Sequence, residues 1–310
     1  MSQARQLEIV EVGPRDGLQN EPVTIPAAVK VEFINRAVAA GLRRIEVASF
    51  VNPRRVPQMA DAEQVLAALP RRDEVHYVGL VLNRAGFDRA AAAGCGEIGM
   101  AVFTTDSFNQ RNQGTTSAGS LRAWREIAAA AHAAGIRAQI TISAAFGCPF
   151  EGEVAPSRVV EIAREAAEGA PFEIAIADTI GVGVPSQVTD LLGRVADALP
   201  GMTLRGHFHN TRNTGLANAY AAVEAGARVL DASLGGLGGC PFAPAATGNI
   251  PTEDLLYMLG RMGIETGVDL DAAIATARWV EQQVGRTVPG MLVKAGPFPG
   301  AGAPVARRAP

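Results

Sequence analysis

The segment LEIVEVGPRDGLQ, residues 7–19, decides between two parallel α/β architectures. Its first half, Leu7–Val12, is a short run with β-branched residues, typical of a buried strand. An open, doubly wound sheet often continues its first strand into a Gly-rich dinucleotide-binding turn of the form GxGxxG. Here the strand continues into GPRDGLQ, which lacks that spacing. The segment therefore favours a closed (β/α)₈ barrel, the TIM barrel.

The rest of the chain repeats the same alternation of a short apolar run with an Ala-rich stretch of helical spacing. The predicted strands are Leu7–Val12, Arg44–Ala48, Tyr77–Leu82, Ile98–Phe103, Ala138–Ser143, Glu173–Ala177, Leu204–His207 and Val229–Ala232. The clearest predicted helices are Ala27–Ala40, Asp61–Leu69, Leu121–Ala134, Ser157–Glu168, Pro185–Leu199 and Leu216–Ala225. Eight strand–helix units are the number that closes a TIM barrel.

The 310 residues fit one such barrel with small additions. Two more helical segments, Glu253–Met262 and Leu270–Val284, follow the eighth strand and are expected to cap or extend it. We therefore predict one catalytic domain over residues 1–295 with a C-terminal helical extension. The remaining residues, 296–310, are rich in Gly, Pro and Ala and are predicted to form a flexible tail.

Composition argues against several classes of partner. The net charge is -3 and the basic residues are scattered, so no nucleic-acid surface is expected. Three cysteines in a chain of this size do not make a disulfide framework. No stretch reaches the roughly 20 apolar residues that span a bilayer, and MSQARQLEIVEV resembles neither a signal nor a transit peptide. A cytoplasmic protein without membrane contact is expected.

Reactive residues of a TIM barrel lie at the carboxyl ends of its strands. Charged and metal-binding side chains gather at several of these ends, far apart in sequence. The candidates are Arg15, Asp16, Glu46, Asp178, His207 and His209, with Cys240 and Asn249 in the Gly-rich segment after the eighth strand.

The pair His207-x-His209 indicates a metal site, because residues two apart in an extended segment point the same way. The alternative is a pair of buried, hydrogen-bonded histidines. Asp16 and Asn249 on the same rim favour the metal, and such a mixed oxygen and nitrogen set suits Mg²⁺ or Mn²⁺. Structural zinc is disfavoured because the chain has no CxxC pairing.

Arg15 offers a permanently charged donor fork for an enolate or a carboxylate; the alternative is a salt bridge to Glu46 or Asp178. Cys240 is either a proton donor or acceptor or a small buried residue. The segment Thr104–Gly114 is predicted as a loop that either contacts substrate or lies on the polar surface. Buried, unreactive thiols are expected at two other cysteines, Cys95 and Cys148.

Five segments carry a family resemblance: EVGPRDGLQNE, IEVASFVNPRRVPQMAD, IADTIGVG, the HFH pair and GLGGCPFAPAATGNIPTEDLLYML. Together they resemble the 3-hydroxy-3-methylglutaryl-CoA (HMG-CoA) lyases of the DRE-TIM metallolyase superfamily, from about Leu7 to about Val284. RDG and HxH alone mark the superfamily, which includes isopropylmalate and homocitrate synthases. The GGCP segment is more specific to the lyases.

The resemblance implies an acyl-CoA substrate cleaved to acetyl-CoA and acetoacetate with Mg²⁺ or Mn²⁺, and it is compatible with a homodimer or larger homo-oligomer. It implies that Arg15 stabilises the enolate, that Cys240 takes part in acid–base chemistry, and that Glu46 and Asp178 support the metal and the proton transfers. His207 and Asp178 are both candidates for the base. The implied metal ligands are Asp16, His207, His209 and Asn249.

The chain also departs from the family pattern, which leaves the acyl group open. Residues 210–215 read NTRNTG where DTYGQA is more usual, and Pro22 stands where a Lys is frequent. Arg212 adds a positive charge near the rim that could favour another substrate carboxylate. Two other functions are compatible with the superfamily: a Claisen-type acyltransferase, which the Cys240 segment disfavours, and an inactive binding barrel, which has no need of a full ligand set.

Overall fold

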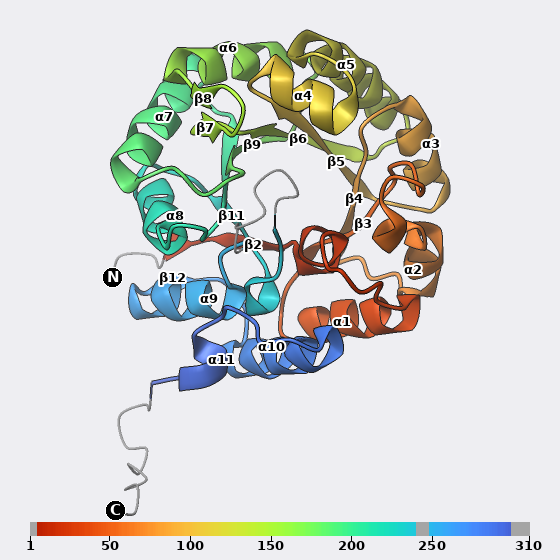
Figure 1. The fold of residues 1–310 in the computed structure, drawn as a ribbon, viewed down its shortest axis with the longest axis vertical. Coiled ribbons are helices and arrows are strands. Elements are labelled where there is room, and N and C mark those ends of the chain that lie inside the picture. The colour runs from red at the N-terminus through yellow and green to blue at the C-terminus, as the bar shows by residue number, and fades with distance from the viewer. Residues whose placement is uncertain (1–4, 240–247, 299–310) are drawn as a thin grey trace, which may run out of the picture.

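Eight parallel strands close into a barrel in the computed structural model, which describes residues 5–239 and 248–298 (Figure 1). Neighbouring strands follow the order β10-β11-β2-β3-β4-β5-β6-β9 around the ring. Their bounds are β2 Glu8–Glu11, β3 Arg44–Ser49, β4 His76–Leu80, β5 Glu97–Phe103, β6 Arg137–Ser143, β9 Glu173–Asp178, β10 Thr203–Phe208 and β11 Val229–Ala232. The predicted TIM barrel and its eight strands are confirmed, with strand ends shifted by at most two residues.

Helices surround the barrel and separate its strands from solvent (Figure 1). They are α1 Ala27–Ala39, α2 Ala62–Ala68, α3 Arg84–Ala92, α4 Asp106–Gln113, α5 Ser117–Ala133, α6 Pro156–Ala167, α7 Pro185–Ala198, α8 Gly215–Glu224, α9 Thr252–Arg261, α10 Leu270–Val284 and α11 Leu292–Ala295. A π-helical turn η1 (Gly13–Gly17) and two 3₁₀ turns, η2 (Pro57–Met59) and η3 (Leu234–Gly236), complete the helical elements of the described residues. All the predicted helices are present.

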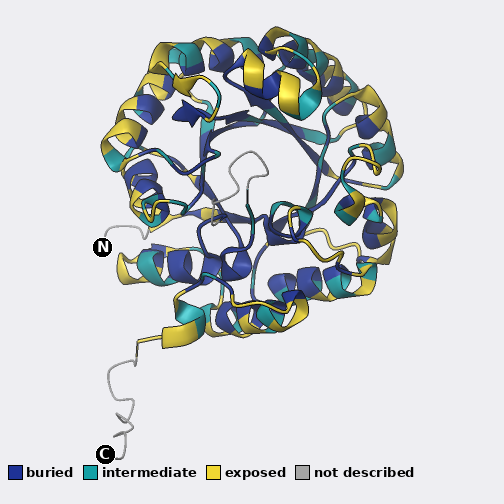
Figure 2. Cartoon of the chain, viewed as in Figure 1, coloured by how far each residue is buried: buried dark blue, intermediate teal, exposed yellow. Residues whose placement is uncertain are grey.

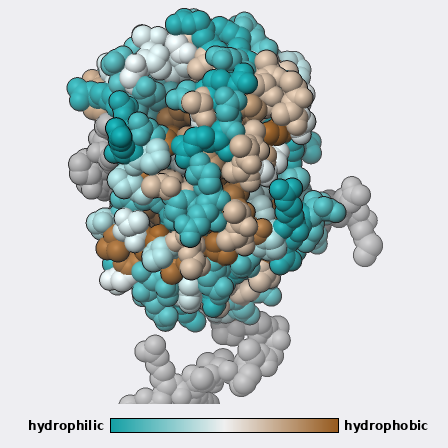
Figure 3. All heavy atoms as spheres, turned by 90° about the vertical axis from the view of Figure 1, so that its right-hand side faces the viewer, coloured by the Kyte–Doolittle hydropathy of each residue, from teal (hydrophilic) through white to brown (hydrophobic). Residues whose placement is uncertain are grey.

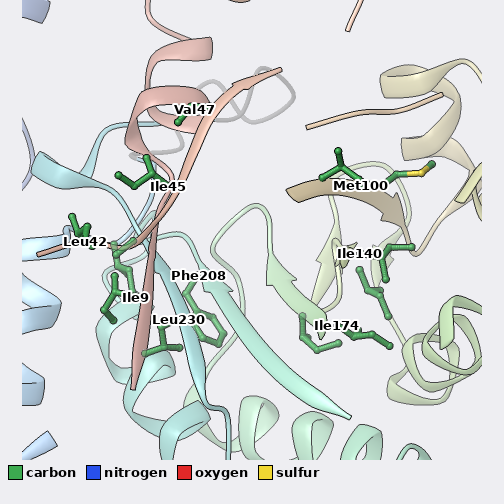
Figure 4. Close-up of a cluster of buried hydrophobic side chains, with 14 of the residues drawn as sticks. Ile9, Leu42, Ile45, Val47, Met100, Ile140, Ile174, Phe208 and Leu230 are labelled. Carbon is green, nitrogen blue, oxygen red and sulfur yellow. The ribbon is translucent and has the colours of Figure 1, made fainter. Parts of the chain in front are cut away.

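Successive strand residues alternate between the helices and the barrel lumen, as the period of two requires. The apolar outward residues pack between strands and helices; Figure 4 labels Ile45, Met100, Ile140, Ile174 and Leu230 among them. Their neighbours along the strands point into the lumen instead. Strands and inward helix faces are buried, whereas outward helix faces are exposed (Figure 2).

The C-terminal elements extend the barrel on one side. Helices α9, α10 and α11 lie next to one another beside α1, and α10 contacts both α1 and η3 (Figure 1). A short parallel pair joins β1 (Arg5–Gln6) to β12 (Ile264–Glu265). Two antiparallel pieces, β7 (Gly147–Cys148) and β8 (Gly152–Glu153), decorate the β6–α6 connection.

The outer surface is mixed. On the face shown in Figure 3, hydrophilic residues predominate and hydrophobic ones form small groups among them. Among the described residues, no helix is both long enough and apolar enough to cross a membrane.

The prediction of a loop over Thr104–Gly114 is wrong, because the segment forms α4. Asn109 is fully buried, and its amide nitrogen donates to the carbonyls of Phe103 and Thr105. Asp106 accepts from the backbone and hydroxyl of Ser117. The polar residues that suggested a loop therefore bind the ends of this helix and the start of the next. Asn112, a third polar residue of this segment, borders the central cavity.

Candidate metal and active site

The turn after β2 places Arg15 and Asp16 at the mouth of the barrel. The carbonyl oxygen of Val12 accepts from the backbone nitrogens of Asp16 at 2.7 Å and of Gly17 at 3.2 Å. The bond from Gly17 spans five residues and makes the turn η1 π-helical. A Cβ at Gly13 would lie 2.5 Å from Glu11 Oε1, so only glycine fits there. Such turns are rare and occur often at functional sites.

Four predicted ligands converge at this mouth. Asp16, His207 and His209 each offer one ligand atom, and these atoms lie within 4.8 Å of one another. An isolated antiparallel bridge brings Asn249 next to His209. The amide nitrogen of Asn249 donates to Asp16 Oδ2 at 2.8 Å and to the carbonyl of Leu237 at 3.1 Å, which leaves its amide oxygen as the atom that could bind a cation.

The protonation states of Asp16 and His209 fit a cation, because ligands must be deprotonated to bind one. Burial alone would raise the pKa of Asp16, but the charges of Arg15 and the two histidines outweigh it and hold the pKa at about 2. Burial, with the neighbouring His207, lowers the pKa of His209 to about 4. An ionised carboxylate and a neutral imidazole therefore stand ready at neutral pH.

Arg15 is held between two carboxylates. Its Nη1 lies 2.7 Å from Asp16 Oδ1 and its Nη2 lies 2.5 Å from Glu46 Oε2. The predicted salt bridge to Glu46 therefore exists, and Arg15 and Glu46 both border the cavity as well. Burial raises the pKa of Glu46 despite the nearby Arg15, so this carboxyl takes up a proton more readily than an exposed one.

Arg15, Asp16 and Glu46 border a cavity in the barrel lumen with a volume of about 170 Å³. One side of this cavity is apolar and the other is polar. Lumen positions of β2, β4 and β5 give it an apolar side that includes Val10, Val78, Leu80 and Ala101. Lumen positions of β6, β10 and β11 give it a polar side that consists of Gln139, Thr141, Ser143, Arg205, His207 and Asp231. Such a mixed cavity suits a small molecule with one apolar and one polar end.

Asp178 lies on the same rim but turns away from the cavity. Its Oδ1 accepts from the backbone of Val182 and its Oδ2 from that of Gly183, both at 2.9 Å. It is buried and is not among the residues that line the cavity. The carboxylate holds the turn after β9, where Arg212 also donates to the carbonyls of Ile180 and Gly181. Arg212 thus binds backbone and, like Asp178, is absent from the cavity lining.

Two of the three cysteines lie within the described residues. Cys95 and Cys148 are buried, as predicted, and burial raises the pKa of Cys95 to about 12. Cys240 lies outside the described residues. Sequence reasoning missed Arg205 and Asp231, although one signal was available. Arg205 precedes His207 by two residues on the same strand and therefore shares its lumen face.

Fold and site together define a TIM-barrel protein with a candidate divalent-cation site at the carboxyl ends of its strands. The chain belongs to the HMGL-like family, whose model matches residues 6–280. It is 46% identical to the (R)-citramalyl-CoA lyase of Chloroflexus aurantiacus, over 93% of this chain and 94% of that protein. It is 43% identical to the hydroxymethylglutaryl-CoA lyase of Pseudomonas mevalonii, over 90% of this chain and 93% of that protein.

Solved structures give the same assignment. An HMG-CoA lyase from Acenitobacter baumannii, in complex with coenzyme A and 3-methylmalate, matches with a TM-score of 0.91 and 40% identity, over 94% of this chain and 95% of that one. A hydroxymethylglutaryl-CoA lyase from Pseudomonas aeruginosa matches with a TM-score of 0.91 and 39% identity, over 95% and 98%. The family resemblance drawn from the sequence motifs is confirmed.

Proposed function

We propose that the chain is a divalent-metal-dependent carbon–carbon lyase that releases acetyl-CoA from a carboxylated 3-hydroxyacyl-CoA. The observation that carries this proposal is the convergence of Arg15 with Asp16, His207, His209 and Asn249 at the mouth of one cavity. The proposed substrate is HMG-CoA, which would give acetyl-CoA and acetoacetate. The lyase names of the relatives above support cleavage over the condensation run by an acyltransferase.

Citramalyl-CoA is a second candidate substrate, favoured by the 46% identity to a citramalyl-CoA lyase. It also carries a hydroxyl, a methyl and a carboxylate at one end, but it is one methylene shorter and would give acetyl-CoA and pyruvate. One methylene in a binding pocket is worth only about 1–3 kcal/mol, so overlapping activities are expected.

Cleavage of the carbon–carbon bond changes the charge on both of its sides, at the tertiary alcohol and at the thioester. The tertiary alcohol must lose its proton, and the bonding electrons pass to the thioester, which becomes an enolate. A divalent cation held by the four ligands, Mg²⁺ or Mn²⁺ by their chemistry, would polarise the hydroxyl and carboxylate oxygens of the substrate. Arg15 would face the negative charge that develops on the thioester oxygen.

Glu46 is the proposed acceptor of the alcohol proton. Of the two bases that the sequence suggests, Asp178 does not line the cavity, and His207 is one of the proposed metal ligands. Glu46 borders the cavity beside Arg15, and burial raises its pKa toward the range of a useful base. The enolate carbon then needs a proton, and Cys240 remains the proposed donor on the strength of the family resemblance alone.

The test is a panel of 3-hydroxyacyl-CoA substrates with direct product detection. We expect acetyl-CoA together with acetoacetate from HMG-CoA, or together with pyruvate from citramalyl-CoA. Consumption of acetyl-CoA with a 2-oxo acid, and no cleavage of either substrate, would instead identify an acyltransferase.

Removal of metal tests the cation site in the same assay. Exhaustive chelation is expected to abolish turnover, and Mg²⁺ or Mn²⁺ is expected to restore it. Unchanged turnover after verified removal of metal would refute a metal-dependent mechanism. A cytoplasmic location, a homo-oligomeric state and the single domain over residues 1–295 stay predictions.

A further inference from the structure

A row of alternating charges crosses the barrel lumen and ends at the candidate metal site. Arg44 lies second from the far end of this row, where its side chain binds one carboxylate of β5 at 2.6 Å and one of β9 at 2.9 Å. The second of these carboxylates also lies 3.1 Å from the guanidinium of Arg205. In order, the row is Glu97, Arg44, Glu173, Arg205, Asp231 and His207.

Asp231 is the last acid in this row and touches a candidate ligand directly. Its Oδ2 lies 2.9 Å from His207 Nδ1, and its side chain is only 5% exposed. A carboxylate accepts and cannot donate, so this contact places the ring proton of a neutral His207 on Nδ1. The lone pair is then on Nε2, the only ring nitrogen left for a cation.

Arg205 faces Asp231 from the other side. Its Nε forms an ion pair with Asp231 Oδ1 at 3.4 Å, and neither atom has a hydrogen-bond partner among the described residues. Its Nη2 donates to Gln139 at 2.8 Å and to Thr141 at 3.2 Å. Glu173 holds its Nη1. Contacts with β6 and β9 hold the guanidinium in place beside Asp231, so the carboxylate that faces His207 lies between two fixed partners. The proton on His207 therefore has one stable position.

We propose that Asp231, held by Arg205, is a positioning residue that selects the metal-binding tautomer of His207. The inference deepens the proposed function and rests on its cation site. His209 differs, because its Nδ1 has no hydrogen-bond partner within residues 5–239 and 248–298. A hydrogen bond thus selects the tautomer of His207 before the cation arrives, whereas none of the described residues does so at Nδ1 of His209. Partners of this kind typically contribute 10–100-fold to metal affinity.

The substitution Asp231→Asn tests this role because Asn has one acceptor and one donor end. The anchored guanidinium of Arg205 attracts the amide oxygen, which turns the NH₂ group toward His207. Nδ1 must then accept, and the proton moves to Nε2, where it blocks the cation. We expect a 10–100-fold weaker affinity for Mn²⁺, measured by titration of the metal-free protein.

A second variant separates the tautomer from a loss of charge. In the double variant Arg205→Met with Asp231→Asn, the amide oxygen is free to face His207 again, so Mn²⁺ affinity should recover by at least about tenfold over Asp231→Asn. The matched control is Glu97→Gln, which removes one buried charge from the opposite end of the row. It should leave Mn²⁺ affinity within threefold of the wild type.

A direct readout is the ¹⁵N spectrum of the metal-free protein. The chain has four histidines, so His207 can be assigned from the signal lost in His207→Gln. We expect a protonated Nδ1 in the wild type and a protonated Nε2 in Asp231→Asn. Circular dichroism and thermal unfolding establish that each variant is folded before its affinity is compared.

The outcomes separate this inference from the function it rests on. If the wild type binds no Mn²⁺, the proposed function fails. If the wild type binds Mn²⁺ and Asp231→Asn binds it equally well, the proposed function stands and the positioning role is overturned. A folded double variant that binds no better than Asp231→Asn, or an equal loss in Glu97→Gln, also overturns it.

Discussion

Arg15 links two parts of the proposed site, because one of its nitrogens contacts the candidate ligand Asp16 and another contacts the proposed base Glu46. Replacing Arg15 by Met removes the guanidinium group that would face the enolate, so Arg15→Met should lower kcat about 10²–10³-fold. The measurement is kcat at saturating substrate and metal, with the fold checked by circular dichroism. Arg212→Met, which changes a residue outside the cavity lining, is the control. A loss of only twofold would return Arg15 to a structural role.

Substitution of two acidic residues on the rim should affect different properties, turnover for Glu46 and stability for Asp178. Glu46→Gln should lower kcat about 10²–10⁴-fold, because Gln cannot accept the alcohol proton. Asp178→Asn places an NH₂ group opposite one of two backbone donors, so it should lower the free energy of unfolding by about 1–3 kcal/mol. Turnover and denaturant unfolding of both variants distinguish a base from a support. If Asp178→Asn instead abolishes turnover without loss of stability, the assignments must be exchanged.

The sequence predicted which residues gather at the mouth but not which way each one points. Strand ends alone placed Arg15, Asp16 and the two histidines, because carboxyl ends of parallel strands meet at one rim. Asp178 also ends a strand, yet it follows Ala177, which faces the lumen, so the alternation turns its carboxylate outward. Asp231 lies below the rim, and its proposed role depends on side-chain contacts with Arg205 and His207 on the neighbouring strand β10.

At the scale of elements, two buried acids hold the segment that follows β11. Glu11 accepts from the backbone of Leu234 and the hydroxyl of Thr252, and Glu253 accepts from the backbone of Gly235. Burial raises the pKa of Glu11 to about 7 and that of Glu253 to about 8. Both carboxyls therefore stay largely protonated well above the usual range for Glu.

A raised pKa in the folded state makes stability depend on pH. The contribution of Glu253 is fully present below its ordinary pKa of 4.5 and is lost as pH rises toward 8. Glu253→Gln mimics the protonated form, so the wild type should lose at least ~1 kcal/mol of unfolding free energy relative to this variant between pH 5 and 8. Denaturant unfolding at several pH values measures the difference, with the exposed Glu224→Gln as control. A constant difference across this range would contradict the buried, protonated state.

The elements themselves were largely predictable, because strand and helix periods are local properties of the sequence. The segment Thr104–Gly114 was not. Its polar residues read as a loop, but several of them bind backbone and hydroxyl groups of neighbouring elements. Gly114, with a φ of 74°, ends the helix in the left-handed region that glycine tolerates best. Tertiary partners decide such a segment, and a local pattern does not contain them.

At the scale of the whole molecule, charged side chains fill the barrel near the amino-terminal ends of its strands, where Arg44, Glu97 and Glu173 begin β3, β5 and β9. Layers of apolar side chains are usual at this place in the fold. Arg44 is fully buried and bridges β3 to both β5 and β9 through Glu97 and Glu173. Two carboxylates on different strands therefore depend on one guanidinium. Removing one partner of a buried ion pair leaves the other charge buried without compensation, so this row makes the contacts between distant strands sensitive to a single substitution.

Arg44→Met should accordingly destabilise the barrel by about 3–5 kcal/mol, because it leaves Glu97 buried with only Arg137 at 3.7 Å and Glu173 with Arg205 alone. Arg194→Met removes an exposed helical pair with Asp190 and should cost less than about 1 kcal/mol. Equilibrium unfolding in urea compares the two. Adding Glu97→Gln to Arg44→Met should recover part of the loss, since the unpaired charge is then gone. If the double variant is no more stable than Arg44→Met, the cost lies in packing, and the charge row does not hold the barrel together.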